Sequence, residues 1–425
     1  MRQYKDSGVE WIGKIPETWE VLQIRRIMRN RSERNQPSAV VLSLYRDWGI
    51  VPKDSRDDNH NVTSEDTSSY KVVSKGNFVI NKMKAWQGSM AVSDYDGIIS
   101  PAYYVCSFTK EVCKKYVHYL LRDASYKPEY MRLSTGMRIG QWDLNIDDFL
   151  RIKAIIPPLA EQQRIADYLD EKCVEIDSLI SLQEQMIEKL KAYKQSVITE
   201  AVTKGLDPNA KLVPSGIDWI GEIPEEWLIT DIKNLCISIT DGSHFSPERQ
   251  SEGMPYITAG DIRGKGIDYN NAMRIRLEDY NTLESQGCRP HKGDVLMVKD
   301  GATTGRVGMM TDDEKCVLLS SVAMLTPLSK VDSNYLMYLV QSNVIQAQIK
   351  LLMAGSAMPR VTLKKINSLK GLLIPLNTQR SIAAYLDSKC SDIDRLIALK
   401  QQKIEALKDY KKSVIYEAVT GKTEI

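Results

Sequence analysis

The chain has 425 residues, enough for two to four domains that each bury a hydrophobic core. Its 43% apolar and 26% charged residues are typical of a soluble globular protein, and with a net charge of +2 any nucleic-acid binding has to come from local patches or partner subunits. No segment approaches the ~18 uninterrupted apolar residues of a membrane span, the N-terminus lacks a signal-peptide core, and seven cysteines without a CxxC pair fit a reducing cytoplasm.

Two regions of mixed composition, residues 1–157 and 214–376, are predicted to be α+β globular domains. In the first, strand-like runs punctuated by Gly and Asp precede a helical stretch; the runs are 21–27, 39–45, 77–81 and 97–108, and the stretch is 112–132. The second has the same character, with runs at 227–235, 254–262, 293–301 and 316–325 and a helical stretch at 334–353. We call these two domains the first and second heads.

The chain contains an internal repeat. The segment DSGVEWIGKIPETW at 6–19 returns 208 positions later as PSGIDWIGEIPEEW at 214–227. The segment 156–180 returns at 374–397. From Pro158 and Pro375 onward, the two copies align residue by residue at a separation of 217 positions. A duplication of this kind suits a target with two parts. We interpret the repeated tryptophan motif as an apolar clasp between head and helix rather than a ligand site.

Each repeat continues into a long amphipathic helix with a heptad seam, in which apolar residues alternate steps of four and three and two positions are polar. The helical regions are 158–213, with a helix near 161–204, and 377–425, with a helix near 378–421. The apolar seam residues are Leu169, Ile176, Ile180, Ile187, Leu190, Val197, Leu386, Ile393, Ile397, Ile404, Leu407 and Val414. Cys173 and Cys390 occupy matching seam positions, where we expect them to pack. A helix of ~40 residues is ~60 Å long and needs a partner, for which the other copy is the obvious choice.

Charge placement favours antiparallel pairing of the two helices. Residues 161–182 carry a net charge of −4, and residues 400–422 carry +3. Antiparallel packing sets these two halves against each other, whereas parallel packing would oppose +1 and +3. Because each exposed pair contributes a few tenths of a kcal/mol, charge acts here as a tie-breaker. The expected architecture is two heads separated by an antiparallel coiled coil, related by a pseudo-two-fold axis.

No catalytic or metal-binding signature is evident. The four histidines are scattered, without partners at metal-ligand spacing. The glycine-containing segments 301–308 and 416–423 lack the complete GxxxxGK[ST] phosphate loop. Pro157-Pro158 lacks the flanking residues with which an aminomethyltransferase holds its target amine. The chain is therefore predicted to be non-catalytic and to carry no cofactor or metal of its own.

Two turns of the first head, 81–89 and 132–145, combine basic, aromatic and amide side chains beside glycine. Such mixtures suit DNA, because Lys and Arg meet phosphates or guanine while amides and hydroxyls bind base edges. The candidate contacts are Lys82, Lys84, Trp86, Gln87, Arg138 and Gln141. Trp142 could brace the loops together with Trp86. The alternative is a solvated loop whose tryptophans cap the core.

The second head offers candidates in 240–249, 298–308 and 354–365. The segment GDVLMVKDGATTGRVGMM is predicted to form a hairpin that presents Lys299, Thr303, Thr304 and Arg306 at its tip. Ser243, His244 and Arg360 complete the set of candidate DNA contacts. A plain hairpin turn, and a structural role for the histidine, are the alternatives.

With these motifs in view, the chain resembles the specificity (S) subunit of type I restriction-modification systems over essentially its whole length. The resemblance rests on both tryptophan motifs, both copies of the segment PPLAEQQRIADYLD, and the segments INKMKAWQGS, DGIISPAYYV, LSTGMRIGQWDL, GDVLMVKDGATTGRVG and GSAMPRVTLKKI. It implies two target recognition domains, each reading one half of a split double-stranded DNA sequence, and an antiparallel coiled coil. Because the heads share little sequence between their terminal motifs, the target should be asymmetric.

The resemblance also implies partners. Two methylase (M) subunits, which carry S-adenosylmethionine, should dock on the chain, and two restriction (R) motor-nuclease subunits, which use ATP and Mg, should join for restriction. Two other classes of function stay open: a coiled-coil adaptor whose heads bind proteins, and a self-contained methyltransferase. The lysine-bearing glycine turns speak against the first, and the missing cofactor motifs speak against the second.

Overall fold

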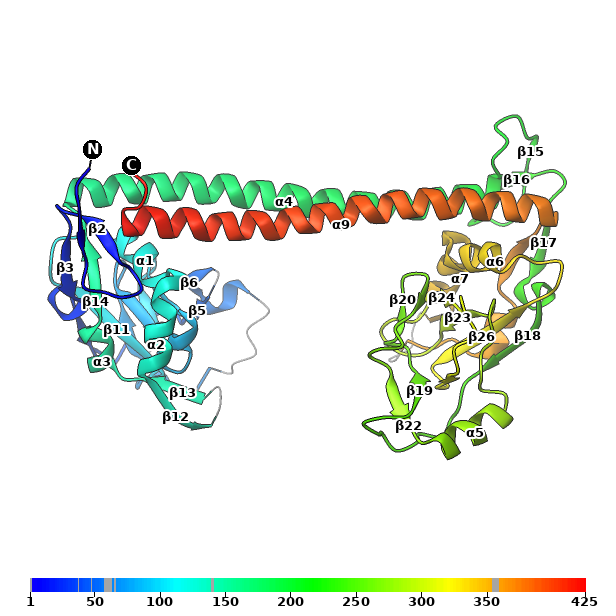
Figure 1. Cartoon of the computed structure of the whole chain (residues 1–425), viewed down its shortest axis with the longest axis horizontal. Helices are drawn as coiled ribbons and strands as arrows, with labels where there is room; N and C mark the ends of the chain where they lie inside the picture. The colour runs from blue at the N-terminus through cyan, green and yellow to red at the C-terminus, as the bar shows by residue number, and fades with distance from the viewer. Residues whose placement is uncertain are drawn as a thin grey trace. The chain divides into compact units, whose positions relative to one another are not determined.

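The computed structural model describes residues 2–36, 38–46, 48–56, 63–64, 66–138, 141–353 and 359–425, without the side chains of Met137, Arg138 and Gln141. The chain divides into two compact units, one formed by Met1–Glu184 with Gln401–Ile425 and the other by Gln185–Lys400. Each unit holds one mixed head together with part of both long helices (Figure 1). The predicted α+β fold class with two long helices is confirmed.

The first head is built on an antiparallel sheet in the order β4-β11-β8-β9, formed by Met28–Arg31, Tyr103–Phe108, Phe78–Asn81 and Met90–Val92. Successive side chains of a strand point to opposite faces. Accordingly, Phe78 and Ile80 join the core that contains the helices, and Val79 joins the core on the other face. The helices are α1 (Lys114–Arg122), α2 (Lys127–Leu133) and α3 (Ile146–Arg151).

Short strand pairs and 3-10 helices complete the first head. The antiparallel pairs are β1 (Tyr4–Asp6) with β2 (Lys14–Pro16), β3 (Glu20–Gln23) with β14 (Lys153–Ile156), β5 (Leu42–Tyr45) with β6 (Gly49–Pro52), β7 (Lys71–Val73) with β10 (Gly97–Ile99), and β12 (Ser134–Arg138) with β13 (Gln141–Leu144). The 3-10 helices are η1 (Ile24–Arg26), η2 (Lys53–Ser55), η3 (Lys82–Gln87) and η4 (Ala124–Tyr126). The expected strand 21–27 therefore turns into η1, and the expected helix 112–132 divides into α1, η4 and α2.

The second head repeats the central sheet in the order β18-β26-β23-β24, formed by Cys236–Asp241, Val322–Pro327, Val295–Val298 and Val307–Met309. Val295 and Met297 face one core while Leu296 and Val298 face the other, as in the first head. The helices are α5 (Leu277–Ser285), α6 (Ser333–Gln341), α7 (Asn343–Met353) and α8 (Leu363–Asn367). Of these, α5 and α8 were not predicted.

The remaining strands of the second unit are short. They are β15 (Leu212–Pro214) with β16 (Glu222–Pro224), β17 (Leu228–Asp231) with β27 (Lys370–Leu373), β20 (Ile262–Arg263) with β21 (Gly266–Ile267), and the sheet β22 (Met273–Ile275), β19 (Met254–Ile257), β25 (Val317–Leu318). The 3-10 helix η5 (Ile232–Leu235) follows β17 as η1 follows β3. The two heads thus share a topology that their sequences reveal only in part.

The long helices are α4 (Leu159–Lys204) and α9 (Leu376–Thr420). Each begins directly after a proline, two residues earlier than predicted, and the oxygen of that proline accepts the first helical hydrogen bond, as an N-cap residue does. Within the first unit, Lys411 Nζ lies 2.7 Å from Asp177, and within the second, Lys194 Nζ lies 2.7 Å from Asp394. The antiparallel arrangement is confirmed, and two of its polar seam positions hold these reciprocal ion pairs.

The apolar seam residues occupy the interface expected of a coiled coil. The buried members are Leu169, Ile176, Ile187, Val197, Leu386, Ile393, Ile404 and Val414. Ile180, Leu190, Ile397 and Leu407 are half-buried. Burial raises the pKa of the Cys173 and Cys390 thiols, as expected of packing residues rather than reactive ones.

The tryptophan motifs hold each head to the end of one long helix, which confirms the clasp. Trp19 shares a buried core with Val419 of α9, and Trp227 shares one with Val202 of α4. Each helix ends at a glycine in the left-handed region, Gly421 (φ 70°) and Gly205 (φ 77°). A Cβ there would lie 3.0 Å and 3.2 Å from the respective tryptophan rings, so the glycines allow close approach as well as the turn.

Candidate nucleic-acid interface

The two candidate loops lie at the same place in the two sheets. In the first head η3 connects β8 to β9, and in the second the segment 299–306 connects β23 to β24. The first residue after the strand makes the same backbone hydrogen bond in both: Lys82 N donates to Ala102 O (3.2 Å), and Lys299 N donates to Ser321 O (2.8 Å). Lys82 and Lys299 are therefore topological equivalents.

The loop of the first head is a capped 3-10 helix. Asn81 accepts a hydrogen bond from Met83 N at 3.2 Å, and the Trp86 indole donates to Met83 O at 3.1 Å. Trp86 packs edge-to-face on Trp142 with 5.1 Å between ring centroids, as the bracing hypothesis expected. Lys82 and Gln87 are half-buried and Lys84 is exposed.

The second loop of the first head is the hairpin β12–β13 rather than the plain turn expected. Its backbone pairs Arg138 with Gln141. The side chains of these two predicted contacts lie outside the described residues. Since Trp142 of β13 meets Trp86, the two candidate loops of this head form one surface.

The prediction that Lys299 is presented at the hairpin tip is wrong. Strands β23 and β24 do form the predicted hairpin, but the Lys299 side chain is 2% exposed. Its Nζ lies 2.9 Å from Asp300 Oδ2 and 3.2 Å from Asp241 Oδ2. Sequence reading missed both aspartates as partners. The two carboxylates offset the cost of removing this ammonium from water, which allows the lysine to lie inward.

Ser243 is likewise an interior turn residue. It is 4% exposed, and its hydroxyl donates to Phe245 O (3.1 Å) and accepts from Phe245 N (2.9 Å). The neighbouring His244 is exposed, with Nε2 3.6 Å from Asp241 Oδ2. The predicted base contact by the serine is not available in this conformation, because its hydroxyl is committed to the turn.

Four remaining candidates surround the tip of the second-head loop. Thr304 donates to Gly301 O at 2.7 Å, and Thr303 is half-buried beside it. The exposed Arg360 pairs through Nε with Asp300 Oδ1 at 3.1 Å. Arg306 is exposed, donates to Ile262 O at 3.3 Å, and lines a groove of about 490 Å³. The groove also contains Lys191, Lys194, Lys265 and Asp394.

A matched tyrosine–aspartate contact joins each head to its long helix. Tyr119 donates to Asp170 Oδ1 and Tyr338 donates to Asp387 Oδ1, both at 2.8 Å. Burial, followed by the hydrogen bond to Asp170, raises the pKa of Tyr119, so the hydroxyl remains a donor at neutral pH. The repeat could have identified the two aspartates, which lie 217 positions apart, but not the tyrosines of the heads.

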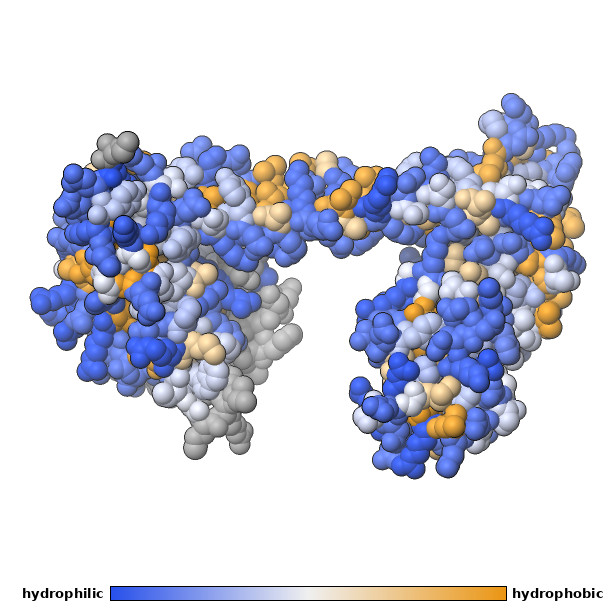
Figure 2. Space-filling view, viewed as in Figure 1, coloured by the Kyte–Doolittle hydropathy of each residue, from blue (hydrophilic) through white to orange (hydrophobic). Residues whose placement is uncertain are grey.

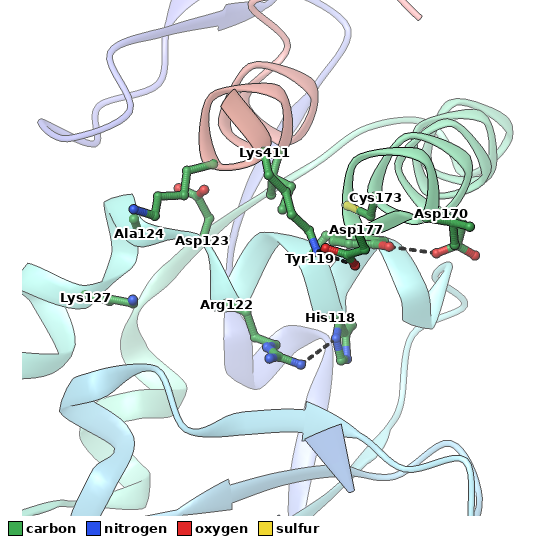
Figure 3. Close-up of a pocket in the computed structure, with 13 residues that line it drawn as sticks. His118, Tyr119, Arg122, Asp123, Ala124, Lys127, Asp170, Cys173, Asp177 and Lys411 are labelled. Atoms are coloured by element: carbon green, nitrogen blue, oxygen red, sulfur yellow. Dashed lines mark hydrogen bonds and ion pairs between the residues drawn. The ribbon is translucent and has the colours of Figure 1, made fainter. Parts of the chain in front are cut away.

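A cavity of about 730 Å³ lies beside the Tyr119 contact (Figure 3). Its lining includes Asp177 and Lys411, which pair with each other, and His118 with Arg122, whose nitrogens lie 2.8 Å apart. Burial, followed by the Arg122 charge, lowers the pKa of His118 to about 3. The imidazole is therefore neutral and structural at physiological pH. Because the cavity's principal charges are paired, we assign it to the junction between head and helix.

Comparison with known proteins places the chain in a family. The family described as "Type I restriction modification DNA specificity domain" matches residues 16–192 and 224–409. The chain belongs to this family. It is a type I restriction-modification specificity subunit with two copies of the domain.

Relatives and solved structures agree with this assignment. The MjaVIII specificity subunit of Methanocaldococcus jannaschii is 25% identical over 100% of this chain and 98% of its own length. The EcoBI specificity subunit of Escherichia coli is 27% identical, over 52% of this chain and 47% of its own. The HsdS subunit of Thermoanaerobacter tengcongensis shares the fold with a TM-score of 0.52 at 17% identity, covering 96% of this chain and 98% of that one. A chain from a study of assembly and conformational transition of the type I R-M system gives a TM-score of 0.69, at 17% identity and 95% and 98% coverage.

Among the described residues, no group of three or more His, Cys, Asp and Glu side chains is placed to hold a metal ion. In the same part of the chain, no helix is both long and apolar enough to cross a membrane.

Proposed function

We propose that each head of this specificity subunit reads one half of an asymmetric, bipartite double-stranded DNA target, and that the chain itself performs no catalysis. The observation that carries this proposal is the equivalence of the two loops. They occupy the same position in matching sheets and both begin with a lysine, but Lys82 is half-buried, Lys299 is buried and ion-paired, and the residues that follow them differ. Equal placement with different side chains suits two readers of different sequences.

Matched apolar side chains on the long helices support docking of two methylase subunits. Leu179 and Leu182 of α4 correspond at 217 positions to Leu396 and Leu399 of α9, and all four are 39–53% exposed. Tyr193 and Tyr410 form a third matched pair, 58% and 54% exposed. Apolar residues are visible on the long helices in Figure 2. A surface that occurs twice suits a partner present in two copies.

In this proposal the methylase subunits carry S-adenosylmethionine, and two restriction subunits bring ATP and Mg. The proposed recognition domains are 1–157 and 214–376, and the proposed helical regions are 158–213 and 377–425. The proposed place of action is the cytoplasm. Helices α4 and α9 each continue without interruption from one compact unit into the other. We propose that this continuous coil fixes the number of unread base pairs between the half-sites.

Methylome sequencing of the native host, with and without this chain, tests the proposal. The expected result is the loss of one bipartite methylated motif when the chain is deleted. Exchange of residues 1–157 for another first head is the matched experiment and should change one half-site. An unchanged methylome on deletion would exclude the modification role, and a change of both half-sites would exclude one head per half-site.

A further inference from the structure

The loop surface of the first head carries cations that have no carboxylate partner in the described part of the chain. Lys82 and Lys84 belong to η3, Lys71 lies near Lys82 at the Tyr104 ring, and the charge of Arg34 acts on Lys71. Among the described residues, no Asp or Glu oxygen lies within 4.0 Å of the charged nitrogens of these four side chains. Most interior cations of folded proteins are paired, so this concentration of unpaired charge requires an explanation.

Lys71 shows how unusual the site is. Its side chain is 5% exposed, and its Nζ donates to the backbone oxygen of Tyr103 at 2.6 Å. The Nζ atoms of Lys71 and Lys82 lie 5.2 Å and 4.7 Å from the centre of the Tyr104 ring, so both ammonium groups interact with the same aromatic ring. Burial, followed by the charges of Lys82 and Arg34, lowers the pKa of Lys71.

Two carboxylates are near but do not neutralise the group. Asp143 and Asp147 act on the Tyr104 hydroxyl, whose pKa is raised by burial first and by Asp143 next. Both aspartates are exposed, and neither forms an ion pair with a described lysine. Since no described carboxylate pairs with Lys71, Lys82 or Lys84, their positive potential is available to an external anion.

The equivalent surface of the second head is neutralised from within. Lys299, the counterpart of Lys82, is held between Asp241 and Asp300, and Arg360 pairs with the other oxygen of Asp300. Two cations and two carboxylates therefore balance there. Arg306 alone of this loop's cations lacks a described carboxylate partner.

We infer that the η3 surface of the first head is a binding site for backbone phosphates of DNA. Lys82 and Lys84 contact the phosphates and Lys71 lies behind them, whereas the matching surface of the second head supplies fewer such contacts. The inference rests on the proposed function and deepens it: both heads read bases, but the first supplies the larger share of the electrostatic attachment.

A larger electrostatic share for the first head can be measured as the salt dependence of DNA binding. Each phosphate neutralised by a protein cation contributes about −0.9 to the slope of log K against log salt concentration. Lys82→Gln with Lys84→Gln should therefore reduce the slope's magnitude by about 1.8. Between 50 and 200 mM salt, that corresponds to roughly a tenfold smaller loss of affinity than the wild type shows.

The experiment uses the full chain with its methylase subunits and a duplex bearing the methylated motif, titrated at several KCl concentrations. Lys75→Gln is the matched control, because this exposed lysine lies in the turn before β8, at the opposite end of that strand from η3. Arg360→Gln tests the second head. The expected result is a smaller slope for the double variant, a wild-type slope for Lys75→Gln and Arg360→Gln, and an unchanged methylated sequence for the double variant.

Two results would overturn the inference without touching the proposed function: a wild-type slope in the double variant, or an equal reduction in Arg360→Gln. Thermal stabilisation of the chain by inorganic phosphate that disappears in the double variant, with no change in the DNA slope, would assign the surface to free phosphate and also overturn it. Failure of the wild-type complex to bind the motif would instead reject the proposed function. Circular dichroism of each variant verifies folding.

Discussion

Replacement of Lys299 by methionine should loosen the centre of the second head, because it leaves Asp241 and Asp300 without their shared cation. Removing one partner of a buried ion pair typically costs about 3–5 kcal/mol. The two carboxylate side chains are 18% and 25% exposed, and Arg360 remains 3.1 Å from Asp300, so water and this arginine offset part of the loss. We expect a loss of about 2–3 kcal/mol in local stability.

Amide hydrogen exchange of peptides covering β23 and β26 measures this local free energy in the folded chain. A loss of 2–3 kcal/mol corresponds to exchange about 30–150 times faster. Lys71→Met is the matched control in the first head, since that buried lysine has no described carboxylate partner and gives up one hydrogen bond, worth about 1 kcal/mol. Exchange in Lys299→Met within about threefold of the wild type would refute the ion-paired interior position and return this lysine to the DNA-facing set.

Three other predictions follow from single features. The pKa of His118 is about 3 in the folded chain and about 6.5 in the unfolded chain, so between these pH values the unfolded chain binds one more proton than the folded chain. The contribution of this histidine to the free energy of unfolding should therefore be fully present above pH 6.5 and fall by about 1.4 kcal/mol per pH unit below it. Exchange of α1 peptides at pH 7.5 and 5.5 should show this loss in the wild type and not in His118→Gln. Inserting one heptad into both α4 and α9 adds ~10 Å and should lengthen the tolerated spacer by about three base pairs; an unchanged spacer in the methylome would show that the coil does not set the distance. Arg306→Ala should weaken DNA binding, and competition with single-base variants separates a base reader, which loses ~1–3 kcal/mol at one position, from a phosphate contact, which loses affinity uniformly.

The two long helices and the tryptophan motifs that join them to the heads, which we call the frame, could be predicted from sequence because their physical causes are local and repeated. Heptad spacing specified the seam of α4 and α9, and opposite charge on the helix halves favoured the antiparallel pairing that Asp177 and Lys411 exemplify. The tryptophan motif indicated a clasp because an apolar cluster beside a long helix has to be buried. These signals depend on residues a few positions apart, which periodicity detects.

The candidate contacts were less predictable because their side-chain positions depend on distant partners. Lys299 looked like a loop cation, but Asp241, 58 positions earlier in the chain, decides its orientation. The hydroxyl of Ser243 accepts a hydrogen bond from Phe245 N within the turn that Ser243 begins. This serine turn is a local motif that the sequence could have indicated. Lys71 carried no signal at all, since nothing in KVVSKG indicates that its amine will lie beside Tyr104.

The internal contacts of the two units show why one duplicated frame can hold two different readers. Gln162 accepts from Cys113 N and donates to Pro157 O, and Gln379, 217 positions later, accepts from Asp332 N and donates to Ile374 O. Both glutamines are buried at the start of a long helix. None of these hydrogen bonds involves a residue of η3 or of the segment 299–306, so we expect a substitution in either loop to leave them intact. The two loops can therefore differ in how their lysines are paired, as Lys82 and Lys299 do, without altering these repeated contacts between head and helix.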